Sequence, residues 1–205
     1  MKQPRDWTEQ QIKYYYGGIK YSDYPQVFWD MMLPHMEGAS TLIDIGCGPG
    51  AFALTAAAAG LKVQAVDISS GNLKALREQI KYRQLSNIEI VHADWLEAVI
   101  KKSEVAVCAY SFGGSIGTLE GVKKIIASTE KVAFLVSPCE RERGDFLSKE
   151  LYVKCGITPS SFSGDHRDIL GAFEKLQQPV KWEIVAYDFG MPIESRDEIQ
   201  PCAIY

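Results

Sequence analysis

From residue 41 onward, the sequence alternates between short β-branched apolar runs and stretches of helical periodicity. The runs at 41–45, 62–66, 88–91, 104–109 and 131–136 predict strands, and the stretches at 51–59, 72–82 and 119–128 predict helices. Strands that alternate with helices of about ten residues require right-handed crossovers between parallel neighbours. The alternation therefore predicts an α/β fold with a doubly wound, mainly parallel sheet.

The regions on either side of this alternation have weaker patterns. Residues 1–40 show helical spacing of apolar side chains, interrupted by Gly17-Gly18 and by Pro25, and predict an N-terminal helical segment where a lid could form. Beyond Pro138 we expect helices at 143–154 and 165–177 and a strand at 180–189. The whole chain, 1–205, is predicted to be one domain, with the helical lid segment at 1–40 and an α/β core at 41–205.

The charge distribution restricts the class of partner. The chain has 22 Lys and Arg residues and 26 Asp and Glu residues, a formal net charge of −4, and its longest basic blocks are the pairs Lys101-Lys102 and Lys123-Lys124. Binding along nucleic-acid phosphates requires many clustered cations. The composition therefore argues against an extended nucleic-acid surface.

The cysteines and the chain start indicate the compartment. Five cysteines, an odd number, are widely spaced and form no Cys-x-x-Cys motif, which favours a reducing compartment over disulfides or a tetrahedral metal site. The first residues are polar, and no apolar run approaches the length of a transmembrane helix. We expect a cytoplasmic protein with no membrane contact and no bound metal.

A glycine-rich loop follows the first predicted strand. In Asp44-Ile45-Gly46-Cys47-Gly48-Pro49-Gly50, three glycines alternate directly before the helix that begins near Ala51. Glycine lets the backbone turn tightly and approach a ligand without a Cβ in the way, and the helix N-terminus offers free N–H groups. The loop is predicted to bind a nucleotide, although a plain tight turn would also need some of these glycines.

Asp67 ends the second predicted strand, twenty-one positions after Gly46. A carboxylate there can accept hydrogen bonds from both hydroxyls of a ribose. The alternative is that Asp67 caps the helix that begins near Gly71.

Two classes of nucleotide enzyme fit this arrangement. Gly46-x-Gly48-x-x-Ala51 satisfies the relaxed dinucleotide fingerprint, so an NAD-dependent oxidoreductase is one interpretation. Asp44, however, would repel a pyrophosphate and would suit an aminoacyl ammonium group or its water shell. Ala93-Asp94-Trp95, after the third strand, supplies a carboxylate that could accept from an adenine amine and an indole that could cover the adenine ring.

With these residues the chain resembles the class I S-adenosylmethionine-dependent methyltransferases, over about residues 40 to 140. The resemblance implies that the loop from Gly46 to Gly50, including Cys47, surrounds the methionine part of S-adenosylmethionine. It implies that Asp67 holds the ribose, that Ile68 packs on the adenine and that Asp94 binds the adenine amine. At the end of the fourth strand, Ala109-Tyr110-Ser111 would supply backbone contacts to the methionine ammonium. The candidate cofactor-binding residues are therefore Asp44, Gly46, Cys47, Gly48, Gly50, Asp67, Ile68, Asp94, Trp95 and Tyr110.

The acceptor is constrained mainly by motifs that the sequence lacks. Tyr110-Ser111-Phe112-Gly113-Gly114 differs from the Asn-Pro-Pro-Tyr type of nucleic-acid amino-methyltransferases, and Pro138-Cys139 has no supporting second motif. We therefore expect a small-molecule acceptor and nominate no catalytic residue, because alignment of an activated methyl group does not require a general base. An NAD-dependent oxidoreductase and a non-catalytic cofactor-binding module remain the alternatives.

Two further groups of residues have both a structural and a functional interpretation. Tyr14, Tyr15, Tyr16, Tyr21 and Tyr24 could form an aromatic lid over a cationic sulfonium, or could belong to a helix that buries two rings and exposes the others. Asp165 and His166 could contact substrate, although Asp165 is first of all a predicted N-cap.

The end of the chain yields a prediction about the sheet. Methyltransferases of this kind usually add a sixth parallel strand, which 180–189 could form, and an antiparallel seventh strand. Residues 191–205 contain Pro192 and Pro201 and offer no β run of ordinary length. We expect a missing or rudimentary seventh strand, which would leave an edge to be covered by a helix, a homodimer partner or a further segment.

Overall fold

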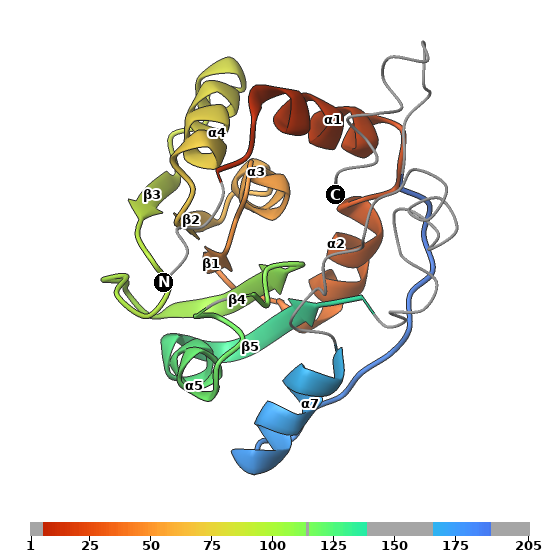
Figure 1. Ribbon diagram of the computed structural model, residues 1–205, viewed down its shortest axis with the longest axis vertical. Helices are drawn as coiled ribbons and strands as arrows, with labels where there is room; N and C mark the ends of the chain where they lie inside the picture. The colour runs from red at the N-terminus through yellow and green to blue at the C-terminus, as the bar shows by residue number, and fades with distance from the viewer. Residues whose placement is uncertain (1–5, 114, 139–165, 190–205) are drawn as a thin grey trace, which may run out of the picture.

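The alternating pattern folds into a five-stranded parallel sheet with the order β3-β2-β1-β4-β5 (Figure 1). The computed structural model describes residues 6–113, 115–138 and 166–189. The strands are β1 (Thr41–Ile45), β2 (Lys62–Asp67), β3 (Ile88–His92), β4 (Ser103–Ala109) and β5 (Thr129–Val136). All five predicted strands and the doubly wound fold class are confirmed.

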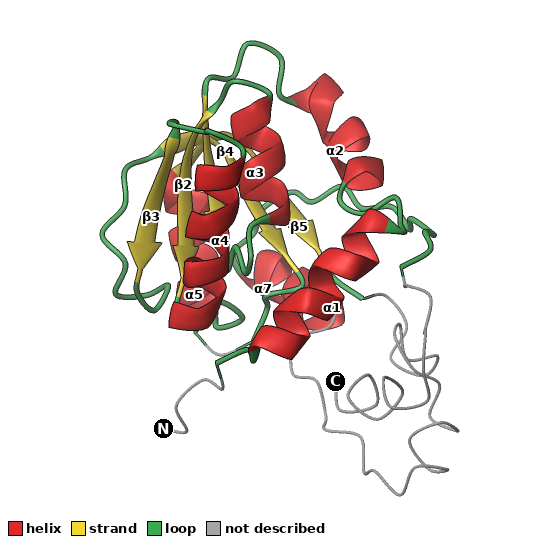
Figure 2. Ribbon diagram, turned by 90° about the horizontal axis from the view of Figure 1, so that it is seen from above, coloured by secondary structure: helices red, strands yellow, loops and turns green. Residues whose placement is uncertain are grey.

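Helices cover both faces of the sheet (Figure 2). On one face lie α2 (Gln26–Met32), α3 (Ala51–Ala58) and α4 (Ser70–Tyr82), and on the other lie α5 (Leu119–Ser128) and α7 (His166–Lys175). Successive strand side chains point to opposite faces, so Leu42 packs with the first group of helices and Ile43 with the second. The predicted helices at 51–59, 72–82, 119–128 and 165–177 are confirmed within a few residues at their ends.

The N-terminal segment is helical, as predicted, but one of its two predicted interruptions is absent. It forms α1 (Glu9–Lys20), α2 and the short 3-10 helix η1 (Leu33–His35). A capping box between Thr8 and Gln11 starts α1. The predicted interruption at Gly17-Gly18 is wrong, because α1 runs through both glycines, and a Cβ at Gly18 would collide with the ring of Phe189. Close packing against that ring accounts for the glycine at position 18.

The predicted strand at 180–189 is also wrong. These residues are described, but they belong to no strand. Val185, Tyr187 and Phe189 pack against the core on the α2–α3 face, whereas Trp182 and Ile184 are each 68% exposed. The alternating pattern is therefore explained by one row of side chains that packs on the aromatic core, without a hydrogen-bonded ladder. The helix expected at 143–154 and the seventh strand expected to be missing from 191–205 lie outside the described residues.

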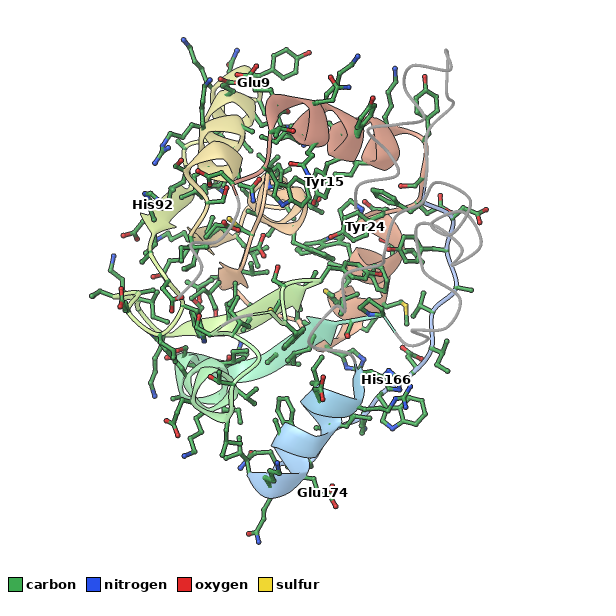
Figure 3. The ribbon with its side chains drawn as sticks, in the orientation of Figure 1. Glu9, Tyr15, Tyr24, His92, His166 and Glu174 are labelled. Carbon is green, nitrogen blue, oxygen red and sulfur yellow. The ribbon has the colours of Figure 1, made fainter. Side chains whose placement is uncertain are left out.

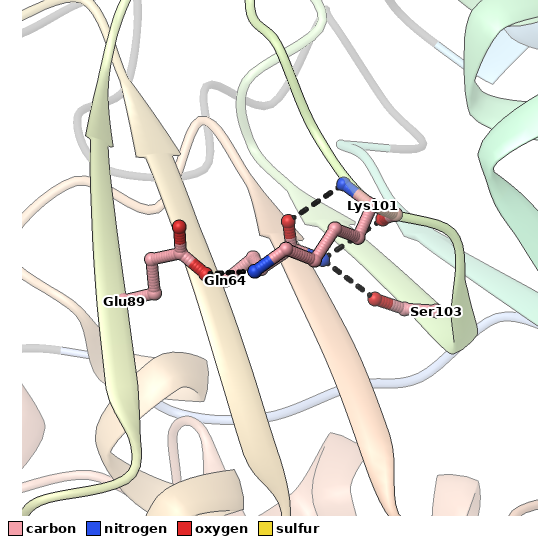
Figure 4. Close-up of polar contacts among 4 residues, drawn as sticks. All are labelled: Gln64, Glu89, Lys101 and Ser103. Carbon is pink, nitrogen blue, oxygen red and sulfur yellow. Dashed lines mark hydrogen bonds and ion pairs between the residues drawn. The ribbon is translucent and has the colours of Figure 1, made fainter.

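A buried amide organises the chain before β4 (Figure 4). Gln64 Nε2 donates to the Lys101 carbonyl at 2.8 Å and to Ser103 Oγ at 3.0 Å, and Gln64 Oε1 accepts from the Lys101 N–H at 2.9 Å. Lys101 also forms an exposed ion pair with Glu89. The Gln64 side chain thereby satisfies both backbone groups of Lys101, just before β4 begins.

Glu104 ties three strands together near their amino ends. Its Oε2 accepts from the Ser40 N–H at 2.6 Å and from Ser40 Oγ at 2.9 Å, and its Oε1 pairs with Lys131 Nζ at 2.7 Å. The Lys131 ammonium is the main reason that the pKa of Glu104 falls to about 2, with the Ser40 hydrogen bonds second.

We predict that Glu104→Gln destabilises the protein in a pH-dependent way. A carboxyl whose folded pKa lies below its unfolded value, about 4.3, stabilises fully above the unfolded pKa and loses this contribution as pH falls toward 2. The loss in unfolding free energy should therefore be larger at pH 7 than at pH 3.5 in urea titrations. Glu89→Gln, in the exposed pair with Lys101, serves as the control and should change little. Equal losses for Glu104→Gln at both pH values would contradict the prediction.

Candidate functional site

The candidate site lies where the strand order reverses. From β1 the chain proceeds outward to β2 and β3, then crosses to β4 on the other side of β1. The loops after neighbouring strands diverge at such a switch point, so ligands of doubly wound folds bind there. The glycine loop follows β1 and Tyr110 follows β4, which places the sequence-predicted loop at this point.

The three glycines of the loop have different structural demands. Gly46, Gly48 and Gly50 have φ values of +65°, +54° and +96°, a region that favours glycine. A Cβ at Gly46 would collide with Ser111, and one at Gly50 with Leu76 Cδ1. A Cβ at Gly48 would have no protein atom within 4 Å apart from those of its chain neighbours. Gly46 and Gly50 are therefore required by packing, whereas Gly48 borders open space in which a ligand could lie.

Asp67 holds the loop from the neighbouring strand. Its Oδ2 accepts from the Gly48 N–H at 2.8 Å, and its Oδ1 accepts from the Ser69 N–H at 2.7 Å. Burial raises the pKa of Asp67, and these two hydrogen bonds oppose the shift. The side chain that caps α4 is Ser69, whose Oγ accepts from the Asn72 N–H, so the interpretation of Asp67 as the helix cap is wrong.

Asn72, in the first turn of α4, was missed by the sequence reasoning. It is 5% exposed, and its Oδ1 is the one buried side-chain nitrogen or oxygen among the described residues without a hydrogen-bond partner. Its side chain lies close enough to Asp67 to lower the pKa of that carboxyl. Unsatisfied buried acceptors are uncommon. Asn72 therefore belongs to the immediate surroundings of the Asp67 carboxyl.

Asp44 is buried beneath the loop, 2% exposed. Its Oδ2 accepts from the Ala53 N–H at 2.8 Å and so binds the first turn of α3. Burial, and then the charge of Asp67, raise the pKa of Asp44 to about 7, despite the hydrogen bond from Ala53. The carboxyl supports the helix that begins after the loop, and its contact with an ammonium group stays a prediction.

Cys47 belongs to the loop through its backbone. Its N–H donates to the Val66 carbonyl at 3.0 Å, which joins the loop to β2. The thiol is free and buried, and burial raises its pKa. Its sulfur is therefore a protonated packing group beside the loop.

The segment after β3 only partly matches its predicted role. Asp94 is half-buried, and its Oδ1 accepts from the Leu96 N–H at 2.9 Å. Ile68 is 40% exposed and offers an apolar surface nearby. The prediction that the Trp95 indole covers an adenine ring is wrong, because Trp95 is 2% exposed within the core on the α5–α7 face and donates its Nε1–H to the Gly121 carbonyl at 3.0 Å.

The end of β4 is locked to the glycine loop. Ser111 Oγ lies 2.8 Å from the Gly46 carbonyl oxygen and 3.0 Å from the Ala109 carbonyl oxygen, and its hydroxyl proton can be donated to either. Tyr110 has φ +54°, which is unusual for a bulky residue and often marks a functional site. Its hydroxyl lies 2.7 Å from that of Tyr187. The backbone of this corner therefore has one defined position relative to the loop.

The helix α1 lies over the site (Figure 3). Tyr16 donates its hydroxyl to the Pro49 carbonyl at 2.9 Å, and Tyr15 lies between α1 and α3. Tyr14 in α1 and Tyr24 before α2 are buried, Tyr15 and Tyr16 are half-buried and Tyr21 is exposed, so the packing interpretation of the tyrosines is confirmed only in part. Contact with a sulfonium stays a prediction.

The two histidines of the sheet end and of α7 lie in different places. His92 is exposed at the end of β3, opposite Asp67 in the sheet, and has Nε2 3.0 Å from the Ile68 carbonyl. His166, at the start of α7, has Nδ1 3.3 Å from the Pro138 carbonyl. Asp165 and Cys139 lie outside the described residues. Within the described ranges, no group of three or more His, Cys, Asp or Glu side chains could hold a metal ion. The helices of those same ranges include none long and apolar enough to cross a bilayer.

Comparison with known proteins agrees with this geometry. Residues 42–132, which contain the glycine loop, Asp67 and Asp94, match the family model for a methyltransferase domain. This central region of the chain is therefore similar to methyltransferase domains, which is consistent with the class I S-adenosylmethionine-dependent methyltransferase family. A ribosomal protein L11 methyltransferase of Clostridium botulinum is 32% identical over 124 residues, and an uncharacterised protein of Haemophilus influenzae is 27% identical over 155 residues.

Solved structures of methyltransferases share the fold of this chain. The magnesium protoporphyrin IX methyltransferase of Synechocystis, crystallised with bound S-adenosylhomocysteine, aligns with a TM-score of 0.58 and 16% identity over 84% of this chain and 78% of its own. The geranyl diphosphate C-methyltransferase of Streptomyces coelicolor aligns with a TM-score of 0.52 and 13% identity over 73% of this chain and 56% of its own. The alignments with the Clostridium and Haemophilus relatives cover 60% and 75% of this chain but only 39% and 56% of the relatives' lengths.

We predict that Asp44→Asn changes the pH dependence of stability. Because the folded pKa of Asp44, about 7, exceeds the unfolded value of about 3.9, its contribution is most favourable below about pH 4 and is lost as pH rises through 7. The unfolding free energy of the wild type minus that of Asp44→Asn should therefore decrease between pH 4 and pH 8. Asp30→Asn, at an exposed position, serves as the control. A flat difference for Asp44→Asn would refute the assigned shift.

We also predict that substitutions of Gly48 and Gly50 destabilise the protein for different physical reasons. Gly48→Ala should cost about 1–2 kcal/mol, the strain of a left-handed backbone alone, because its Cβ meets open space. Gly50→Ala should cost roughly 1–3 kcal/mol more, because Leu76 is fully buried and cannot move aside. Thermal and urea unfolding of both variants measure this difference, and equal losses would contradict the packing role of Gly50.

Proposed function

We propose that this protein binds S-adenosylmethionine and transfers its methyl group in line to a small-molecule acceptor. The observation that carries the proposal is the open space at Gly48, bordered by the Asp67 carboxylate and lying at the strand switch point. The match of residues 42–132 to a methyltransferase domain supports the same cofactor.

The proposed cofactor contacts follow the three loops. The Gly46–Gly50 loop, with Cys47 in it, would lie along the amino-acid part, near the backbone of Tyr110. Asp67 would accept from the ribose hydroxyls, using the lone pairs that Gly48 and Ser69 leave free. Ile68 would pack on the adenine and Asp94 would accept from its amine. Asp44 would act from beneath the loop, by holding α3 in place.

Bound S-adenosylmethionine supplies an activated methyl group on a sulfonium. The chain's own contribution is alignment and exclusion of water. Tyr16 closes α1 onto the loop at Pro49, and Ser111 fixes the β4 corner against Gly46. These contacts would orient the cofactor without any side chain serving as a general base, and we nominate no catalytic residue.

An aromatic cluster supports an acceptor with an apolar body. Tyr24 lies with its ring centroid 6.0 Å from those of Tyr110 and Tyr187 and 5.7 Å from that of Phe189, and Phe28 lies 5.1 Å from Tyr187. This cluster adjoins the end of β4, beside the loop. Aromatic faces favour apolar and cationic groups. The net charge of −4 disfavours binding to the phosphates of a nucleic acid and so favours a small-molecule acceptor.

The two alternatives are less well supported. The strand order is shared with dinucleotide-binding folds, so topology alone does not exclude an NAD-dependent oxidoreductase. The family match and the carboxyl of Asp44 beneath the loop both favour the methyltransferase. A non-catalytic cofactor-binding module would bind S-adenosylhomocysteine and transfer no methyl group to any acceptor.

Compartment and assembly complete the proposal. The five cysteines without a paired motif support a reducing, cytoplasmic location. Within the described ranges, β5 pairs with β4 alone, so its other edge could be covered by a second copy of the chain. Light scattering after gel filtration would test for the homodimer.

We predict that Asp67→Ala weakens S-adenosylhomocysteine binding by about 2–4 kcal/mol, roughly 30- to 1,000-fold, because the ribose hydroxyls lose a charged acceptor. Isothermal titration calorimetry with S-adenosylhomocysteine and, in parallel, with NAD measures this effect. The wild type should bind S-adenosylhomocysteine and give no binding heat with NAD. Glu130→Ala, at the distant amino end of β5, is the control. Unchanged affinity of Asp67→Ala would remove the ribose assignment, and tight NAD binding would overturn the proposed class.

A further inference from the structure

One lysine collects three backbone carbonyls next to Asp94. Lys124, on α5, donates from Nζ to the carbonyls of Trp95 and Ala98, each at 2.7 Å, and of Leu96 at 3.1 Å. An ammonium group has three protons, and these contacts employ all of them. The Nζ also lies 4.9 Å from the centroid of the Trp95 indole. A single side chain thus binds the whole turn that follows Asp94.

This turn is otherwise held at its beginning by Asp94 itself. The Asp94 carbonyl accepts from the N–H groups of Glu97 and Ala98, at 3.1 and 2.8 Å, and the Asp94 carboxylate accepts from the Leu96 N–H at 2.9 Å. The turn therefore resembles one turn of helix, whose last carbonyl groups have no hydrogen-bond donor within the turn itself. Lys124 supplies these hydrogen bonds from α5, more than twenty residues further along the chain.

The fold makes Lys124 a rigid connection. The Trp95 indole is buried against α5, where it donates to the Gly121 carbonyl one turn before Lys124. Two contacts, one through the indole and one through the ammonium, therefore join the turn to α5. The neighbouring Lys123 differs, because it pairs with Glu120 on the exposed side of the helix and its side chain is 50% exposed.

We infer that Lys124 is a positioning residue for base recognition: it fixes the turn 94–98 so that the Asp94 carboxylate is presented to the amino group of an aminopurine. The inference rests on the proposed function, which assigns the adenine amine to Asp94. An amine donates to a carboxylate, whereas the 6-oxo group of hypoxanthine would place an acceptor against it. Loss of the Lys124 contacts would let the turn move and would reduce this discrimination.

A purely structural lysine would behave differently. It would stabilise the turn, so its loss would lower the unfolding temperature, but the preference between the two bases would not change. The ratio of dissociation constants for two ligands that differ only at the 6-position of the base separates these cases, because a general loss of stability affects both ligands alike.

The experiment uses the full chain and measures dissociation constants of S-adenosylhomocysteine and S-inosylhomocysteine by calorimetry, with the unfolding temperature of each variant. We expect the wild type to prefer the adenosyl ligand by about tenfold or more, and Asp94→Ala to lose most of that preference. Lys124→Met should reduce the preference at least threefold, and Lys124→Gln, which keeps an N–H donor, should fall between Lys124→Met and the wild type. Lys123→Met should match the wild type.

The double variant Lys124→Met with Asp94→Ala tests whether Lys124 acts through Asp94. If it does, the double variant has the same preference as Asp94→Ala alone, because coupled residues are not additive. An unchanged preference in both Lys124→Met and Lys124→Gln, together with a lowered unfolding temperature, would overturn the inference. A retained preference in Asp94→Ala would also overturn it and leave the cofactor proposal intact. A wild type that binds neither ligand would instead refute the proposed function.

Discussion

The hydrogen bond from the Gly48 N–H to Asp67 is the contact on which the site depends. It crosses from the loop after β1 to the end of β2, at 2.8 Å, and it places the part of the loop with the most open surroundings beside a buried carboxylate. An ionised carboxylate is costly to bury unless N–H groups compensate for lost water. Backbone donors from Gly48 and Ser69 meet that requirement, and in doing so they determine the shape of the loop.

A second buried carboxylate, that of Asp44, lies beneath the loop. Asp44 joins the end of β1 to the first turn of α3, so the loop between them is held at both ends. The negative charge of Asp67 repels that of Asp44, and burial raises the pKa of both carboxyls. Two carboxyls in one partly desolvated site therefore create a local preference for positive charge and for hydrogen-bond donors. A ligand with an ammonium group and ribose hydroxyls has that character.

Elements distant in sequence close this site from several directions. The helix α1 contacts the loop through the Tyr16 hydroxyl. At the end of β4, the Tyr110 hydroxyl lies 2.7 Å from that of Tyr187, in the segment after α7. Neither α1 nor Tyr187 belongs to the α/β core region that matches the methyltransferase family, which ends at residue 132. The region that matches the methyltransferase domain thus supplies the loop and Tyr110, whereas the segments outside it supply Tyr24 and Tyr187, the aromatic rings that surround Tyr110.

The sequence by itself determined the sheet, its parallel strands and the position of the glycine loop, because side-chain periodicity and glycine placement act over a few residues. It also identified Asp67, since strand end and spacing coincide there. Tertiary structure decided the rest. Only packing shows that the Trp95 indole lies in the core, that Gly18 continues a helix against Phe189 and that the alternating residues of 180–189 pack without a ladder. Each of these depends on which distant surface a residue meets, and local pattern contains no such information.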